Sequence, residues 1–214
     1  IWGEKMLALA KVIDKTAMKY DVDIIVTPQY TDIKLLADNT ERILVFAQHM
    51  DSLPVGRGLG SVLPEAVKAA GAVGVMLNHA EKPLTMEEVE ATIKRADEVG
   101  LTTIVCADSM ADAGRIAGLH PDIIVAEPSE LIGTGVSVGP EYVEAATKCV
   151  KDVNPDILVL TAAGIAGGED VYNTIIAGAD ATGSSSGVAK AADRAAMVDE
   201  MIAACRKAWD ERHK

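Results

Sequence analysis

A carboxylate placed directly after an apolar run is the first feature of this sequence that could do chemistry. Residues 123–126 read Ile-Ile-Val-Ala, Glu127 follows them, and Pro128, Gly133 and Gly135 come shortly afterwards. Parallel α/β proteins place catalytic groups at the carboxyl ends of strands, so Glu127 is a candidate general base. The alternative role for Glu127 is to cap a helix that follows the strand.

A histidine after another apolar run is the second candidate. Val75-Met76-Leu77 precedes Asn78 and His79, and Glu81 lies two residues further on. A histidine at the carboxyl end of a strand can take part in catalysis, so His79 is a candidate catalytic residue. The alternative is a structural, hydrogen-bonded side chain. We expect that structural role for the other three histidines, His49, His120 and His213.

Two later segments rich in small residues could approach a phosphate group. The backbone of Ala162-Ala163-Gly164-Ile165 is little shielded by side chains, and Ser185-Ser186-Gly187 begins a helical pattern whose amino terminus would favour an anion. Barrels often bind phosphate after their last two strands. We therefore predict phosphate-binding positions at Ala163, Gly164, Ser185 and Ser186.

The elements that would position these groups alternate between apolar, strand-like runs and helical patterns. We expect strands at residues 23–27, 43–48, 73–77, 102–107, 122–127, 156–161 and, more weakly, 179–184. The alternation predicts a parallel sheet in a single α/β domain over residues 1–214. Only seven residues are aromatic, so the core must consist mainly of Ala, Val, Ile, Leu and Met.

Three helices have recognisable ends. An amphipathic helix begins near Gly3 and ends near Tyr20. In the segment 85–99, Thr85 and Glu88 have the spacing of a capping box, and Gly100 is a stop signal. The segment 169–177 is followed by Gly178, another stop.

The net charge of −12 argues against nucleic acid or an anionic membrane as a partner. The apolar runs are short, and the amino terminus lacks the pattern of a signal peptide, so we expect a soluble cytoplasmic protein. Cys106, Cys149 and Cys205 are odd in number and widely spaced. We expect reduced thiols rather than a disulfide framework or a metal site.

Three motifs together resemble one family. They are Glu127-Pro128-x-x-x-Ile132-Gly133-Thr134-Gly135, Asn78-His79-Ala80-Glu81 and Phe46-Ala47-Gln48-His49. They resemble the triosephosphate isomerases, and most closely the short archaeal-type branch. The resemblance implies a (β/α)8 TIM barrel and an aldose–ketose isomerase that interconverts dihydroxyacetone phosphate and D-glyceraldehyde 3-phosphate, a step of glycolysis and gluconeogenesis.

The resemblance also implies roles and partners. Glu127 would be the base and His79 the electrophile, with Asn78 and Glu81 in support, and the reaction would need neither a metal nor an organic cofactor. The substrate would be a small phosphorylated sugar, and Gly133 would be a further phosphate-binding position. The protein would be a homo-oligomer, dimer or tetramer, in which residues 50–60 reach the neighbouring subunit. Two alternatives stay open: a catalytically weak sugar-phosphate-binding barrel, and an isomerase of another short ketose phosphate.

Some positions depart from the family pattern. Gly58-Leu59-Gly60 stands where a threonine-bearing loop tip is usual, Ala80 replaces a serine, and Ala162 replaces a glycine. The family's first strand carries a lysine in an Asn-x-Lys segment, and nothing in these residues matches it. Either that strand lies upstream of Ile1 or the protein lacks it. An open barrel would expose a strand edge, which favours the first alternative.

Overall fold

The computed structural model describes residues 1–128 and 138–214. Within these ranges seven strands form one sheet, in the order in which they occur in the chain, and every pairing is parallel. The strands are β1 (Ile25–Val26), β2 (Leu44–Ala47), β3 (Gly74–Leu77), β4 (Thr102–Ala107), β5 (Ile123–Ala126), β6 (Leu158–Thr161) and β7 (Ala181–Thr182). All lie within the ranges expected from the apolar runs, so the predicted parallel sheet is confirmed.

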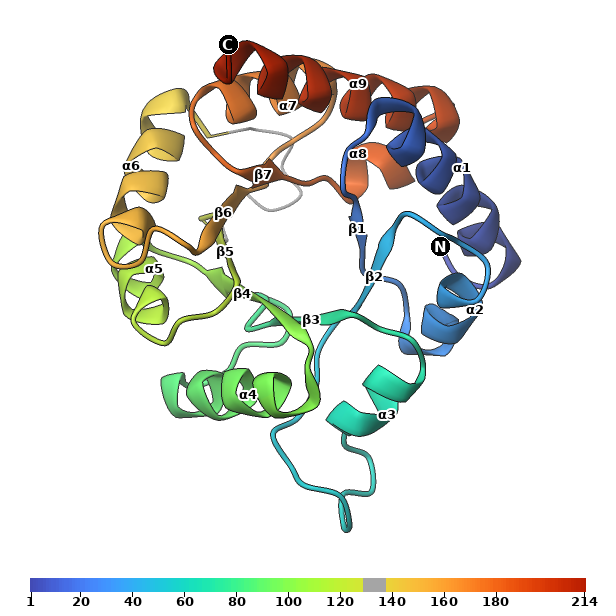
Figure 1. Ribbon diagram of the computed structural model, residues 1–214, viewed down its shortest axis with the longest axis vertical. Helices are drawn as coiled ribbons and strands as arrows, with labels where there is room; N and C mark the ends of the chain where they lie inside the picture. Colours follow the sequence, from blue (N-terminus) through green and yellow to red (C-terminus); the bar gives the residue numbers. More distant parts are fainter. Residues whose placement is uncertain (129–137) are drawn as a thin grey trace.

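Helices connect the strands and surround them. They are α1 (Glu4–Tyr20), η1 (Tyr30–Asp32), α2 (Ile33–Ala37), α3 (Pro64–Ala69), α4 (Met86–Val99), α5 (Met110–Ala117), α6 (Pro140–Lys151), α7 (Gly168–Ile176), α8 (Ser186–Ala189) and α9 (Arg194–Arg212). Figure 1 shows the strands as an inner ring and the helices as an outer one. This is the predicted (β/α) barrel architecture. No helix in the described part of the chain is long and apolar enough to cross a membrane.

The strands β1 and β7 stand at the two ends of the sheet. Each is two residues long, and within residues 1–128 and 138–214 they do not pair with each other. A (β/α)8 barrel has one further strand between these two positions. That eighth strand stays a prediction.

Side chains on alternate strand positions build two separate apolar layers, as a parallel sheet buried on both faces requires. Val105 and Ile124 pack with residues of the surrounding helices. A second cluster contains only strand residues and fills the ring: Phe46, Ile104, Cys106, Ile123 and Val125. A Cβ atom on Gly74 would come within 2.3 Å of the Phe46 ring, so the glycine makes room for the one phenylalanine inside the barrel.

The predicted ends of α4 are confirmed in atomic detail. Thr85 Oγ1 accepts the Glu88 N–H (3.2 Å), and the Glu88 carboxylate accepts the Thr85 N–H (2.8 Å). Gly100 then ends the helix with a left-handed φ of 72°. The capped start of α4 thus lies directly after the segment that carries His79.

Candidate active site

Glu127 lies one residue beyond β5, at the carboxyl end of the sheet. Its backbone N–H donates to the carbonyl of Ala107, the last residue of β4 (3.2 Å). The residue is only 9% exposed. The next helix that the structure describes, α6, begins at Pro140 with Gly139 as its cap, so Glu127 does not cap it.

Burial changes the acidity of Glu127. The pKa of this carboxyl is raised above its ordinary value, and burial is the largest cause. Asp108 also acts to raise the pKa, whereas the nearby His79 acts to lower it. A carboxylate with a raised pKa is a stronger base than a solvated one. The position therefore suits a group that must remove a proton from carbon.

His79 follows β3 and is held in one orientation by its own turn. Its carbonyl accepts the Lys82 N–H (2.7 Å), and its Nδ1 accepts the Glu81 N–H (3.2 Å). Residues 79–82 thus form a single hydrogen-bonded turn, and α4 begins only at Met86. A ring nitrogen that accepts a hydrogen bond carries no proton, so the neutral imidazole has its proton on Nε2. This nitrogen is the one that can donate to a ligand.

The sheet brings His79 and Glu127 to the same edge. The strands before them, β3 and β5, both pair with β4, and parallel strands end on the same side. His79 acts to lower the pKa of Glu127, against the effect of burial, so the two side chains lie within electrostatic reach of each other. The two residues proposed from the sequence are thus neighbours across one strand.

The two supporting residues differ in what they do. The Glu81 side chain is 91% exposed, and its carboxylate oxygen lies 3.9 Å from His79 Nδ1, so this surface pair contributes little. Its backbone N–H, by contrast, sets the tautomer of His79. The Asn78 side chain uses both of its polar atoms: Nδ2 donates a hydrogen bond to the Cys106 carbonyl (2.9 Å), and Oδ1 accepts one from the Leu84 N–H (2.8 Å).

Asp108 is a charged group that the motifs did not single out. It directly follows the last residue of β4, and its charge contributes to the raised pKa of both Glu127 and Cys106. A signal for it was present, because a carboxylate after an apolar run is the same pattern that marked Glu127. Its neighbour Cys106 has a pKa raised to about 12, first by burial and then by Glu127, so its thiol stays protonated at neutral pH.

The two predicted phosphate segments lie side by side. Ser184 Oγ donates to the carbonyl of Ile165 (2.7 Å). A Cβ atom on Gly187 would meet that carbonyl oxygen at 3.0 Å, so the start of α8 packs closely on the turn after β6. Gly164 has a φ of 75° within this turn. The segments that contain Ala163, Gly164, Ser185 and Ser186 thus contact each other through Ile165, Ser184 and Gly187, whereas Gly133 lies outside the described residues.

Comparison with known proteins decides the family. The chain matches a family model described as triosephosphate isomerase over residues 3–204. The chain belongs to the triosephosphate isomerase family. It is 41% identical over 201 residues to a protein of that name from Methanobacterium bryantii, covering 92% of this chain and 88% of that one. The corresponding protein of Methanocaldococcus jannaschii is 38% identical over 203 residues, covering 94% and 92%. That of Sulfolobus acidocaldarius is 37% identical over 213 residues, covering 99% and 92%.

In this member of the triosephosphate isomerase family, each of the remaining histidines contacts a neighbouring polar group, and the cysteines form no disulfide. His49 Nε2 lies 3.4 Å from Asp51, His120 Nδ1 lies 3.1 Å from Asn154, and His213 Nδ1 lies 2.8 Å from the Trp209 carbonyl. These contacts agree with the structural role expected for the three histidines, and that role stays a prediction. Cys106, Cys149 and Cys205 are all free thiols.

Proposed function

We propose that this protein interconverts dihydroxyacetone phosphate and D-glyceraldehyde 3-phosphate, as an intramolecular aldose–ketose isomerase of glycolysis and gluconeogenesis. The observation that carries the proposal is the pairing, across β4, of a buried carboxylate, Glu127, with an imidazole, His79, whose Nδ1 accepts a backbone N–H and whose Nε2 is left to donate. Support comes from relatives named triosephosphate isomerase, one of them 41% identical. We assign the activity to the cytoplasm.

The chemistry divides between the two residues. The ionised Glu127 removes a proton from the carbon next to the carbonyl group, which leaves an enediolate. The Nε2–H of His79 donates to the oxygens on which negative charge develops. The protonated Glu127 then returns the proton to the neighbouring carbon, and the hydroxyl proton passes from one oxygen to the other. The product therefore differs from the substrate in the places of these two hydrogens and of the double bond. No step calls for a metal or an organic cofactor.

The phosphate group of the substrate would bind between the turn after β6 and the start of α8. Close packing of Gly187 on the Ile165 carbonyl supports this assignment, because it holds the two segments against each other, and the backbone N–H groups at the start of a helix favour an anion. Gly133 is a third proposed position. A crystal grown with phosphate or sulfate should hold the anion beside Gly164 and Ser186. An anion bound elsewhere on the surface, with these positions empty, would contradict the assignment.

The direct test is an isomerase assay on the purified protein with glyceraldehyde 3-phosphate, run in parallel with a four-carbon ketose phosphate. We expect turnover of the three-carbon substrate. Turnover of the four-carbon substrate alone would show that the protein is an isomerase of another short ketose phosphate. Binding of both without turnover would establish a sugar-phosphate-binding protein in place of an enzyme.

The role of Glu127 is tested by Glu127→Asp, which shortens the side chain by one methylene group. Displacing a catalytic group by about 1 Å can cost on the order of 100-fold in rate. We therefore expect kcat to fall by about that factor while KM changes little. Turnover equal to that of the unmodified protein would remove Glu127 from the mechanism.

His79→Asn should lower kcat by roughly 100-fold or more through loss of the oxyanion donor.

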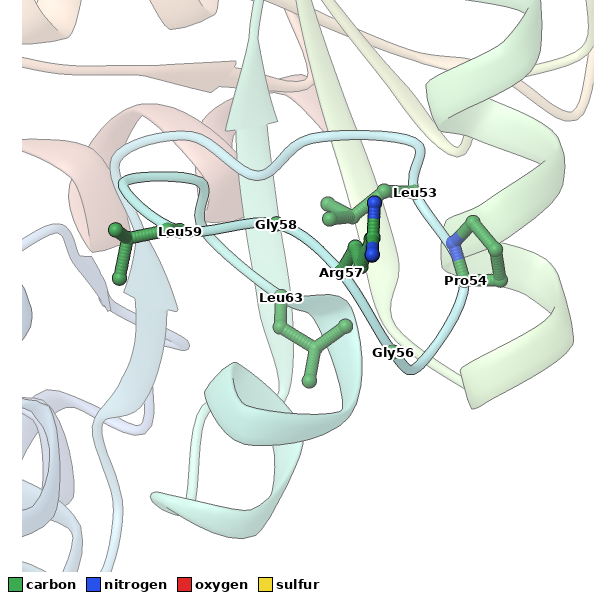
Figure 2. A pocket seen from close by; sticks show the side chains of 7 residues that line it. All are labelled: Leu53, Pro54, Gly56, Arg57, Gly58, Leu59 and Leu63. Atoms are coloured by element: carbon green, nitrogen blue, oxygen red, sulfur yellow. The ribbon is translucent and has the colours of Figure 1, made fainter.

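A homo-oligomer, dimer or tetramer, is the second part of the proposal. The segment between β2 and α3 extends away from the ring of helices (Figure 1). It forms an open hollow of about 530 Å³ lined mainly by apolar and glycine residues: Leu53, Pro54, Gly56, Arg57, Gly58, Leu59 and Leu63 (Figure 2). Projecting apolar side chains favour contact with another protein surface over contact with water.

A further inference from the structure

We propose that Asn78 is a positioning residue that fixes His79 relative to Glu127, with the carboxyl end of β4 as the common reference. The proposal rests on the function assigned to His79 and Glu127 above. It adds a third residue, which touches neither the substrate nor the reacting atoms and acts through β4.

The backbone of Asn78 prepares the turn that carries His79. Its φ of 56° lies in the left-handed region, where asparagine is tolerated better than most residues other than glycine. This conformation redirects the chain immediately after β3, so that His79 begins a new turn instead of continuing the strand. The orientation of the imidazole therefore depends on how firmly Asn78 is held.

The side chain of Asn78 holds that turn at both ends. Its Nδ2 donates to the Cys106 carbonyl (2.9 Å), and its Oδ1 accepts the Leu84 N–H (2.8 Å). The first bond ties the turn to β4. The second bond closes the segment from His79 to Leu84 just before the capped start of α4 at Thr85.

Glu127 is tied to the same strand end one residue later. The carbonyl of Ala107, which follows Cys106, accepts the Glu127 N–H (3.2 Å). Two consecutive carbonyls of β4 thus hold the two proposed catalytic segments, one on each side. Because β4 is central and its residues 103–107 are buried, this reference is rigid. Loss of the Asn78 bond would free His79 from it while leaving Glu127 in place.

The test compares two variants of Asn78 with a matched control. Asn78→Gly keeps the left-handed backbone and removes both side-chain bonds, whereas Asn78→Asp keeps the acceptor for Leu84 and removes only the donor to Cys106. The control, Asn154→Gly, also deletes two hydrogen bonds, to His120 and to the Asp156 N–H, far from the proposed site. We expect kcat to fall at least about tenfold in both Asn78 variants with KM nearly unchanged, and to stay constant in the control.

A spectroscopic measurement separates this inference from the proposed function. Nitrogen-15 NMR of the histidine rings should show His79 as the Nε2–H tautomer in the unmodified protein, and a mixture of tautomers in the Asn78 variants. An active unmodified protein whose two Asn78 variants keep full turnover and a single tautomer would overturn the positioning role. An inactive unmodified protein would overturn the isomerase function, and the tautomer comparison would still decide what Asn78 does.

Discussion

At the residue scale, the burial of Glu127 has opposite effects on chemistry and on folding. The raised pKa makes the carboxylate a stronger base, yet the ionised form is less favourable in the folded protein than in water. For an acid whose pKa is raised on folding, the associated stability is fully present below the unfolded pKa and is lost as the pH rises through the folded pKa. The active form of the protein is thus not its most stable form.

This gives a prediction for Glu127→Gln, which keeps the shape of the side chain and removes the charge. The variant should be inactive but more resistant to thermal unfolding than the unmodified protein at pH 7 to 8. The gain should vanish near pH 4, below the ordinary pKa of about 4.3, where Glu127 is protonated in both states. Melting temperatures across this range test it. A variant less stable at neutral pH would contradict the cost assigned to the buried charge.

Asp108 supplies a second prediction at this scale. Its charge contributes to the raised pKa of Glu127, after burial, which is the largest cause. Asp108→Asn should therefore lower the pKa of the base and move the acidic limb of the kcat/KM profile to lower pH. Asp112→Asn, a change in the exposed first turn of α5, is the control and should leave that limb in place. A limb that moves to higher pH would show that the Asp108 charge does not act on Glu127.

At the element scale, strands and long helices were predictable because each carries its own signal. The apolar run 123–126 marks β5, and the pair Thr85 and Glu88 marks the start of α4. The short elements η1 and α2 carry no comparable local signal, and α3 carries only a proline at its first turn. Their positions depend on contacts with residues far away in the sequence.

Asp14 is such a distant contact. It lies on α1, is 6% exposed, and accepts the backbone N–H groups of Glu41, Arg42 and Ile43 just before β2. Burial acts to raise the pKa of this carboxyl, but the three backbone bonds outweigh it, and the net pKa is lowered. The stability that these bonds provide is therefore present above the unfolded pKa and is lost as the pH falls through the lower folded pKa.

Asp14→Ala should consequently destabilise the protein at neutral pH, because it leaves backbone donors without a partner. Loss of hydrogen bonds to a charged group typically costs about 1–3 kcal/mol. Urea unfolding at pH 7 measures this change. The control is Asp38→Ala, which removes a surface ion pair with Lys34. The Asp38 side chain is 56% exposed, so this pair should contribute little to stability. Equal midpoints for Asp14→Ala and the unmodified protein would show that this carboxylate does not hold α1 to β2.

At the scale of the whole molecule, the sequence predicted which strand ends carry chemical groups, and the barrel explains how they meet. Glu127 and His79 are 48 residues apart in the chain, yet each follows a strand, β5 and β3 respectively, that pairs with β4. The contribution of Asp108 and the bond between Asn78 and Cys106 depend on this pairing. Sequence patterns do not contain that information, because it arises only when three separate segments lie side by side.

The projecting segment between β2 and α3 is the other feature of the whole molecule. Asp51 and Val62 close its base through two hydrogen bonds, from the Asp51 N–H to the Val62 carbonyl (2.9 Å) and from the Val62 N–H to the Asp51 carboxylate (2.6 Å). Leu53 packs against Gly58, where a Cβ atom would approach it to 2.1 Å. Leu59 points away from both Leu53 and Arg57 and is fully exposed (Figure 2).

Leu59 therefore provides the sharpest test of assembly. A fully exposed side chain stabilises nothing within its own chain, so Leu59→Asp should leave the melting temperature of the monomer unchanged. In a symmetric contact each copy would bury this leucine, which is worth about 1.5–3 kcal/mol per side chain. Losing it from both copies amounts to at least about 3 kcal/mol, or roughly a 100-fold weaker association.

Light scattering at micromolar concentration should accordingly show an oligomer for the unmodified protein and smaller species for Leu59→Asp. Val153→Asp is the matched control, since Val153 is also an exposed aliphatic residue (49%) but lies on the α6–β6 turn, away from the projecting segment. It should leave the assembly intact. An unmodified protein that is monomeric under these conditions would contradict the proposed oligomer. Dissociation by Val153→Asp but not by Leu59→Asp would place the contact on another face. An introduced aspartate weakens the association only where the contact would bury its charge.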